Sequence, residues 1–239
     1  LRGSPQPFDE RLSRLKKQIG QHLVAGAMMK LLKDSEVIES HKGPHKVQDA
    51  YSLRCIPQVL GACYESIHYA RQVVEIEINS ATDNPLIVPG SEEVLSGGNF
   101  HGQSLAFALD FLALGLVVLG AIAERRVARL IDAHLSDLPP FLTEHSGLQS
   151  GMMLLQYTAA ALVSENKVYA HPASADSIPT SANQEDHNSM GQGAALKARR
   201  VLENARRIVA IEYLCAAQGL EFLRPLRPGI GPRVAHRVI

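Results

Sequence analysis

Three segments of this chain concentrate side chains that can do chemistry and are poor in residues that merely form turns. They are Val47–Cys55, Ser96–His101 and Thr180–Met190. Binding and catalytic residues tend to lie on connections that a rigid scaffold positions. We therefore expect the function of the chain to reside in these three segments.

Arg54 is the residue of the first segment whose type says most about a ligand. Its guanidinium presents a planar fork of donors that fits a carboxylate through two hydrogen bonds, which lysine cannot reproduce. Tyr51 and Gln48 precede it closely enough for one segment to direct all three side chains inward. From the residues alone, the simpler interpretation is a surface arginine paired with Asp49 and a core tyrosine at position 51.

Taken together, the three segments resemble the signature loops of the aromatic amino acid ammonia-lyases, in the branch that acts on histidine. Ser80–Leu86 and Asp137–Leu142 also resemble family segments, and the matches follow the family's order along essentially the whole chain. The resemblance implies a predominantly helical homotetramer whose active sites combine residues from more than one subunit. It also implies non-oxidative elimination of ammonia from an amino acid, which gives urocanate when histidine is the substrate.

The resemblance assigns roles in the site to six residues. Catalytic roles fall to Tyr51 and Glu185, and substrate-binding roles fall to Gln48, Arg54, Phe100 and Gln184. Arg54 is expected to bind the substrate carboxylate, and Phe100 is expected to pack beside the substrate ring. Without the resemblance, Phe100 reads almost as well as an ordinary core residue at a helix start. Tyr51 is expected to help place substrate or electrophile, because the family's essential tyrosine precedes this region.

Glu185 is the residue that discriminates between substrates. A carboxylate accepts a hydrogen bond from neutral or protonated imidazole, whereas a phenyl ring would leave it unsatisfied at a cost of roughly 1–3 kcal/mol. Phenylalanine-specific relatives usually lack an acid here, so Gln184-Glu185 favours histidine. Some tyrosine-acting relatives also carry Asn-Gln-Glu-Asp, so a tyrosine or phenylalanine ammonia-lyase or aminomutase stays open as the alternative.

The family's electrophile, methylidene-imidazolone, forms when an internal Ala-Ser-Gly cyclises, and this chain contains no Ala-Ser-Gly. We therefore expect residues 1–239 to be one helical substrate-binding part of the enzyme, truncated at both ends and inactive alone. The missing N-terminal part would then be a further partner. The alternative from another class is a non-catalytic helical piece that assembles with a partner or with other copies of itself.

Composition argues against several other classes of protein. Lys plus Arg and Asp plus Glu balance at 24 each, so nucleic-acid binding is not expected. Three cysteines without a Cys-x-x-Cys motif suit a reducing, cytoplasmic location. His41 and His45 flank Gly43-Pro44 and cannot share a helical face, so no metal site is expected. The Gly-Ser-Ser-x-Met-Pro-x-Lys loop of the fumarase and aspartase group is missing.

The elements that position these segments are predicted to be long helices, because apolar residues recur at helical spacing through most of the chain. Helices are expected over residues 8–32, 57–80, 103–133, 149–166 and 186–223. Leu86–Val88 and Val94–Leu95 flank a Pro-Gly turn and predict one small β-hairpin. Residues 105–123 carry only Asp110 as a charge and approach membrane-spanning length. We expect this helix to form the buried centre of the bundle and not to span a membrane.

Overall fold

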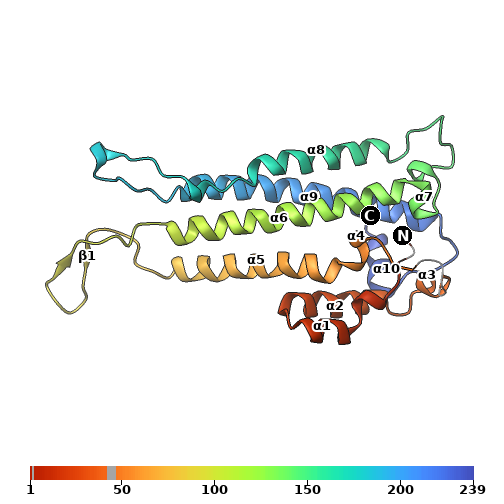
Figure 1. The fold of residues 1–239 in the computed structure, drawn as a ribbon, viewed down its shortest axis with the longest axis horizontal. Coiled ribbons are helices and arrows are strands. Elements are labelled where there is room, and N and C mark those ends of the chain that lie inside the picture. Colours follow the sequence, from red (N-terminus) through yellow and green to blue (C-terminus); the bar gives the residue numbers. More distant parts are fainter. Residues whose placement is uncertain (2, 42–46) are drawn as a thin grey trace.

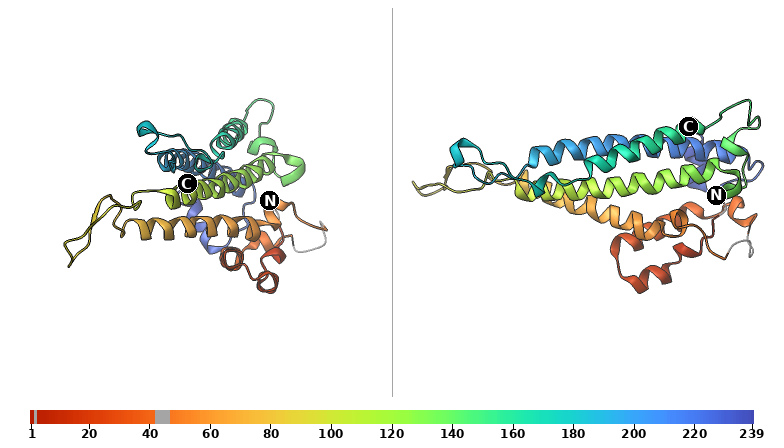
Figure 2. Two further views of the ribbon diagram at one scale, coloured as in Figure 1. Left: turned by 60° about the vertical axis from the view of Figure 1, so that its left-hand side comes forward. Right: turned by 45° about the horizontal axis from the view of Figure 1, so that its top comes forward.

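Four long helices lie side by side in the computed structural model, which describes residue 1, residues 3–41 and residues 47–239 (Figure 1). They are α5 (Ile56–Glu77), α6 (Gln103–Ile131), α8 (Met153–Tyr169) and α9 (Gly191–Glu221). Each long helix runs opposite to the one before it, so the connections alternate between the ends of an elongated bundle (Figure 2). The prediction of an all-α bundle is confirmed.

The two ends of the bundle carry different connections. Residues 78–102 and 170–190 lie at what we call the hairpin end, and residues 47–55 and 132–152 lie at the α4 end (Figure 1). The short elements are η1 (Gln6–Phe8), α1 (Glu10–Lys16), α2 (Ile19–Leu32), α3 (Glu36–Glu39), α4 (Tyr51–Arg54), β1 (Leu86–Ile87), β2 (Val94–Leu95), α7 (Ala133–Ser136), η2 (Pro140–Leu142), η3 (Ala173–Ala175), η4 (Ser181–Asn183) and α10 (Ile230–His236). Strands β1 and β2 pair antiparallel with Leu86 opposite Leu95, which confirms the predicted hairpin.

The core lies along the contact between α6 and α9. Ala123 and Val127 of α6 and Ile208 and Cys215 of α9 are 0% exposed. Small residues on α6 allow this close approach: a Cβ added at Gly120 would lie 3.1 Å from the end of the Ile208 side chain. Each fully buried large apolar side chain contributes about 1.5–3 kcal/mol, so this seam is the main support of the bundle.

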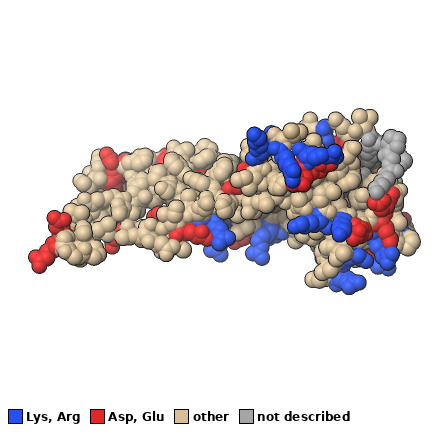
Figure 3. Space-filling view, turned by 90° about the horizontal axis from the view of Figure 1, so that it is seen from below, with Lys and Arg blue, Asp and Glu red and all other residues tan. Residues whose placement is uncertain are grey.

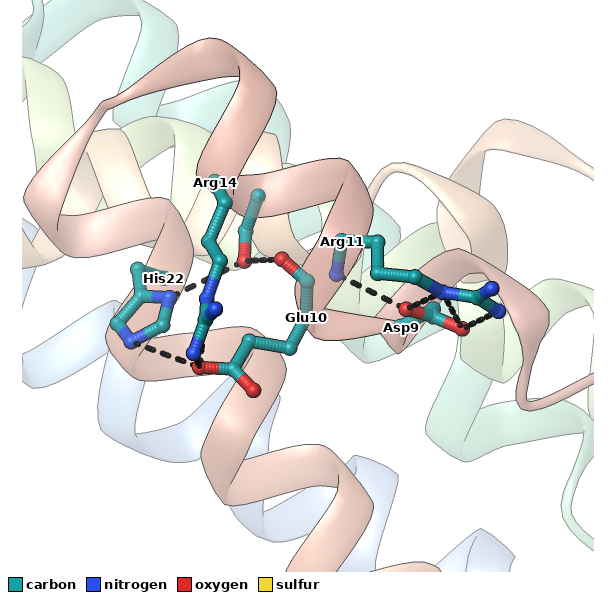
Figure 4. A network of polar contacts seen from close by, with 6 residues as sticks. Asp9, Glu10, Arg11, Arg14 and His22 are labelled. Carbon is teal, nitrogen blue, oxygen red and sulfur yellow. Dashed lines mark hydrogen bonds and ion pairs between the residues drawn. The ribbon is translucent and has the colours of Figure 1, made fainter.

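The single helix predicted over residues 8–32 is wrong, because the chain divides there into α1 and α2. The break is at Lys17, whose φ of 63° is left-handed. Ser13 ties the two helices together: its hydroxyl donates to the Glu10 carbonyl at 3.0 Å and lies 3.2 Å from Nδ1 of His22 (Figure 4).

Gly20 allows α2 to pack against α5. A Cβ added at Gly20 would lie 2.2 Å from the carbonyl oxygen of Gly61, and one added at Gly61 would lie 2.4 Å from the backbone nitrogen of Gln21. The Gly20 N–H also donates to Oε1 of Glu65 at 2.9 Å. The two backbones therefore touch, and only residues without a Cβ permit this contact.

Helix α6 is long and apolar enough to cross a membrane, and no other helix in the described part of the chain is. A bundle's core helix has the same composition. Its buried acids are paired with groups on neighbouring elements: Asp110 with Lys197 on α9, and Glu124 with Gln156 on α8. These contacts favour the bundle interpretation.

One face of α6 is not covered by the other helices of this chain. Phe107, Phe111, Leu114 and Val118 are between 41% and 54% exposed, and their spacing places them on one side of the helix. We call these four residues the α6 stripe. On the side of the molecule seen in Figure 3, Lys and Arg gather toward the α1–α2 region, and the half nearer the hairpin shows scattered Asp and Glu but few Lys or Arg.

Candidate active site

At the α4 end, Arg54 stacks on Tyr51. Their spacing of three residues puts both side chains on the same face of α4, and Cζ of Arg54 lies 4.5 Å from the centre of the Tyr51 ring. This stacking holds the guanidinium without using its hydrogen-bond donors. Nε of Arg54 is buried and has no hydrogen-bond partner in the described part of the chain. This donor is therefore unsatisfied within the described chain, and a carboxylate is the kind of group that accepts from such a donor.

The carboxylate of Asp49 does not pair with the guanidinium of Arg54. Its Oδ2 accepts from the backbone N–H of Ser4 at 2.7 Å, and the described residues show no ion pair between Asp49 and Arg54. The interpretation of Arg54 as a surface residue paired with Asp49 is therefore wrong. Tyr51 is 69% exposed, so it is not a core tyrosine either, and Gln48 is also exposed.

Two residues that the sequence analysis did not single out hold α4 in place. Arg126 of α6 forms an ion pair with Glu212 of α9, with Nη2 and Oε2 2.9 Å apart. The same guanidinium reaches the Ser52 carbonyl oxygen at 3.5 Å from Nη1. The Arg126 side chain is only 13% exposed, so this pair is screened less than a surface pair. No motif could reveal it, because its partners are distant in sequence.

At the hairpin end, Glu185 sits on a tightly closed loop. The backbones of Thr180 and Glu185 bond to each other in both directions, at 2.9 Å and 3.3 Å, and the Thr180 hydroxyl donates to Oε2 of Glu185 at 2.6 Å. The intervening Ser181–Asn183 turn is left-handed at all three residues. Gln184 and Glu185 are exposed, so the loop presents the carboxylate outward with one oxygen already hydrogen-bonded.

Phe100 lies at the same end, just before α6, and is 57% exposed, so it is not a core residue of this chain. Its loop is held by Asn84, whose Oδ1 accepts from the Ser96 hydroxyl at 3.1 Å and from the Gly97 N–H at 2.7 Å. The Asn84 turn and the Phe100 loop, two of the segments that the sequence analysis singled out, therefore form one structure.

Asp110 anchors the base of the Glu185 loop. Its Oδ2 accepts from the backbone N–H of Ser174 at 2.8 Å, and Nζ of Lys197 lies 3.5 Å from Oδ1. Lys197 also donates to the carbonyl of His171. Burial alone would raise the pKa of Asp110, but the hydrogen bonds from Ser174 and Ala173 and the charge of Lys197 hold it below its ordinary value. The aspartate is therefore charged and fixes η3 against α6 and α9.

The six predicted site residues fall into two groups at opposite ends of the bundle. Gln48, Tyr51 and Arg54 lie at the α4 end, and Phe100, Gln184 and Glu185 lie at the hairpin end (Figure 1). Along α6, Gln103 and Arg126 mark the two ends, and at about 1.5 Å per residue they are about 35 Å apart. No molecule of the size of an amino acid can touch both groups of one chain.

In the described part of the chain, no group of three or more His, Cys, Asp or Glu side chains is placed to hold a metal ion. His45 lies outside the described residues, whereas His41 is included. The residues gathered at the two ends are instead hydrogen-bonding and aromatic side chains. One group offers the guanidinium of Arg54 and the other offers the exposed carboxylate of Glu185 to a ligand.

Residues 1–239 match the family described as aromatic amino acid lyase. A histidine ammonia-lyase from Caldanaerobacter subterraneus is 54% identical over 100% of this chain and 47% of that protein. The crystal structure of histidine ammonia-lyase from Trypanosoma cruzi superposes with a TM-score of 0.90 at 48% identity, covering 99% of this chain and 44% of that one. Tyrosine aminomutase from Streptomyces globisporus gives 0.91 at 38% identity, covering 99% and 49%. The chain thus spans about half the length of these relatives.

Proposed function

The chain belongs to the aromatic amino acid lyase family, and on that premise we propose that residues 1–239 form the helical substrate-binding part of a histidine ammonia-lyase. The complete enzyme would eliminate ammonia from L-histidine and release urocanate. The observation that carries the proposal is the exposed carboxylate of Glu185, held by Thr180 on a closed loop. A fixed carboxylate can accept a hydrogen bond from imidazole in either protonation state.

Arg54 supplies the second contact that a histidine substrate needs. Its donor fork is stacked on Tyr51 and is not engaged by Asp49, so we propose that it binds the α-carboxylate. Tyr51, exposed beside it, would help to place the substrate, with Gln48 next to it. Phe100, at the same end as Glu185, would pack beside the imidazole, and Gln184 would add a polar contact.

The family's methylidene-imidazolone group must come from outside these residues, because the chain has no Ala-Ser-Gly. The α4 end fits such a group as a neighbour, since Ser52 Oγ and Arg54 Nε are buried polar atoms with no hydrogen-bond partner in the described chain. When bound, the group supplies the electrophile that makes ammonia a better leaving group. The residues of this chain would bind and orient the amino acid against it.

We also propose that the enzyme is a homotetramer in which one copy's Arg54 group meets another copy's Glu185 group. The separation of about 35 Å within one chain requires a second copy if both groups serve one substrate. The α6 stripe offers an apolar surface along the bundle for such a copy to cover. A cytoplasmic location is part of the proposal, and the free thiols of Cys55, Cys63 and Cys215 suit a reducing compartment.

The second candidate is a tyrosine ammonia-lyase or aminomutase, because a phenol hydroxyl can also donate to Glu185. The complete protein should be supplied in turn with L-histidine, L-tyrosine and L-phenylalanine. We expect urocanate, followed by its ultraviolet absorbance, and little conversion of the other two amino acids. Equal or faster conversion of tyrosine would replace the proposed substrate. The isolated chain of residues 1–239 should release no ammonia from histidine.

A further inference from the structure

His101 and His187 join the two loops at the hairpin end. Nε2 of His101 lies 3.2 Å from the backbone carbonyl oxygen of His187, and the two imidazole rings are stacked with centres 5.8 Å apart and planes 11° from parallel. His101 directly follows Phe100, and His187 follows Glu185 by two residues. The contact therefore links the segment that carries the aromatic side chain to the segment that carries the carboxylate.

The carbonyl group determines that Nε2 of the His101 ring is a donor in this contact. A carbonyl oxygen can only accept, so Nε2 of His101 must carry the hydrogen of this bond. Neutral His101 is thereby held as the Nε2–H tautomer. The His101 backbone is itself held, because its N–H donates to the carbonyl of Gly98 at 2.9 Å. The donor thus belongs to a fixed part of the Phe100 loop.

From His187 the hydrogen bonds continue to Glu185. The peptide group between His187 and Asn188 is held on both sides, since its carbonyl accepts from His101 and its N–H donates to Oγ of Ser177 at 2.8 Å. The side-chain amide nitrogen of Asn188 donates to the backbone carbonyl of Ile178 at 2.6 Å and lies 3.3 Å from the backbone carbonyl of Glu185. A displacement of this peptide group would therefore move the backbone of Glu185.

The starts of α6 and α9 support the same contact. A Cβ added at Gly102 would lie 3.6 Å from Oγ of Ser189, and one added at Gly191 would lie 3.5 Å from the carbonyl oxygen of Gly102. Ser189 Oγ also accepts from the Gly191 N–H at 3.3 Å. The two loops thus lead into helices that begin in contact, and His101 is the side chain that bonds across them.

We infer that His101 is a positioning residue that fixes Glu185 for ring recognition by donating from Nε2 to the His187 carbonyl. The inference rests on the proposed function of Glu185 and deepens it. His101 donates to the backbone carbonyl of His187 and not to its side chain, so the His187 ring contributes only its stacking face to this contact. The Nε2–H of His101 is the part that cannot be replaced by an apolar ring.

Three single variants of the complete enzyme distinguish the effect of losing the Nε2–H donor of His101 from the effect of changing an aromatic ring. His101→Phe keeps an aromatic face and loses the donor, so kcat/KM for histidine should fall about tenfold, the size of one neutral hydrogen bond. His101→Gln keeps a side-chain N–H at a comparable reach and should retain activity within about threefold. His187→Phe keeps both the carbonyl and a ring, so it should also stay within about threefold. Thermal unfolding of each variant reports on loss of structure.

A double-variant cycle tests whether His101 acts through Glu185. If it does, His101→Phe should cost much less in a Glu185→Gln enzyme than in the wild type, because the positioned charge is already lost. Additive losses, an effect of His187→Phe as large as that of His101→Phe, or no rescue by His101→Gln would each overturn the inference. Failure of the wild-type enzyme to form urocanate would instead refute the proposed function, which keeps the two failures distinguishable.

Discussion

The guanidinium of Arg54 lies over the ring of Tyr51, with Cζ 4.5 Å from the ring centre, and its buried Nε has no hydrogen-bond partner in the described part of the chain. Arg54→Lys in the complete enzyme keeps the charge but loses both the planar fork and the stacking. We expect kcat/KM for histidine to fall about tenfold to a hundredfold, and any residual turnover of phenylalanine to fall by a similar factor. A loss confined to one substrate would show that Arg54 does not read the shared carboxylate.

Glu185→Gln should instead separate the two substrates. The amide keeps the shape of the carboxylate and can still accept from Thr180, but it lacks the charge that pairs with imidazole. We expect kcat/KM for histidine to fall about tenfold or more, with residual turnover of phenylalanine changed by less than about threefold. Steady-state kinetics with both amino acids measures this. Equal losses would mean that Glu185 acts on the amino acid backbone or the electrophile.

Much of the fold can be predicted from helical periodicity. Where the predicted helix bounds differ from the structure, the cause is local. The last long helix was expected from residue 186 but begins at Gly191. The backbone groups before Gly191 form other hydrogen bonds instead. Glu185 bonds with the backbone of Thr180, and the Asn188 N–H donates to Oγ of Ser177. Helix α10 is not among the predicted helices, because it is short and Pro228 and Pro232 interrupt the helical spacing there.

The resemblance to family segments pointed to the six candidate site residues, but it did not show how they are arranged. Because α5 runs the length of the bundle, the segments before and after it lie at opposite ends, which separates Arg54 from Phe100. The return along α6 and α8 then brings Glu185 to the end where Phe100 lies (Figure 1). Contacts such as Arg126 with Glu212, or His101 with His187, depend on helix packing and leave no local pattern in the sequence.

The contact between α2 and α5 gives a prediction about stability. Gly61→Ala would place a Cβ 2.4 Å from the Gln21 backbone nitrogen, so it should lower the free energy of unfolding by at least about 2 kcal/mol. Gly26→Ala on the same α2 helix meets nothing within 4 Å and should raise it by about 0.5–1 kcal/mol. Denaturant unfolding monitored by circular dichroism compares the pair at equal protein concentration. Similar effects of the two changes would contradict the described packing.

Part of the free energy of unfolding should depend on the charge of Asp110 and be lost in acid. Its pKa is lowered in the folded chain from the ordinary 3.8, so its contribution is present above that value and is lost as pH falls through the folded-state pKa. Asp110→Asn should therefore lower stability by about 1–3 kcal/mol at neutral pH and by progressively less below pH 3.8. Urea unfolding across pH provides the comparison, with exposed Glu92→Gln as the control. A difference that does not shrink in acid would show that Asp110 does not act through its charge.

We propose that an Arg54 group and a Glu185 group from different copies serve one substrate. Arg54→Ala and Glu185→Ala versions of the complete enzyme should each be nearly inactive. Co-expressed in equal amounts, they should assemble mixed oligomers in which up to about a quarter of the sites combine two intact groups. Urocanate formation by the purified mixed enzyme is the measurement. We expect recovery toward that fraction of wild-type activity. Mixed oligomers no more active than the separate variants would show that sites are not shared between copies.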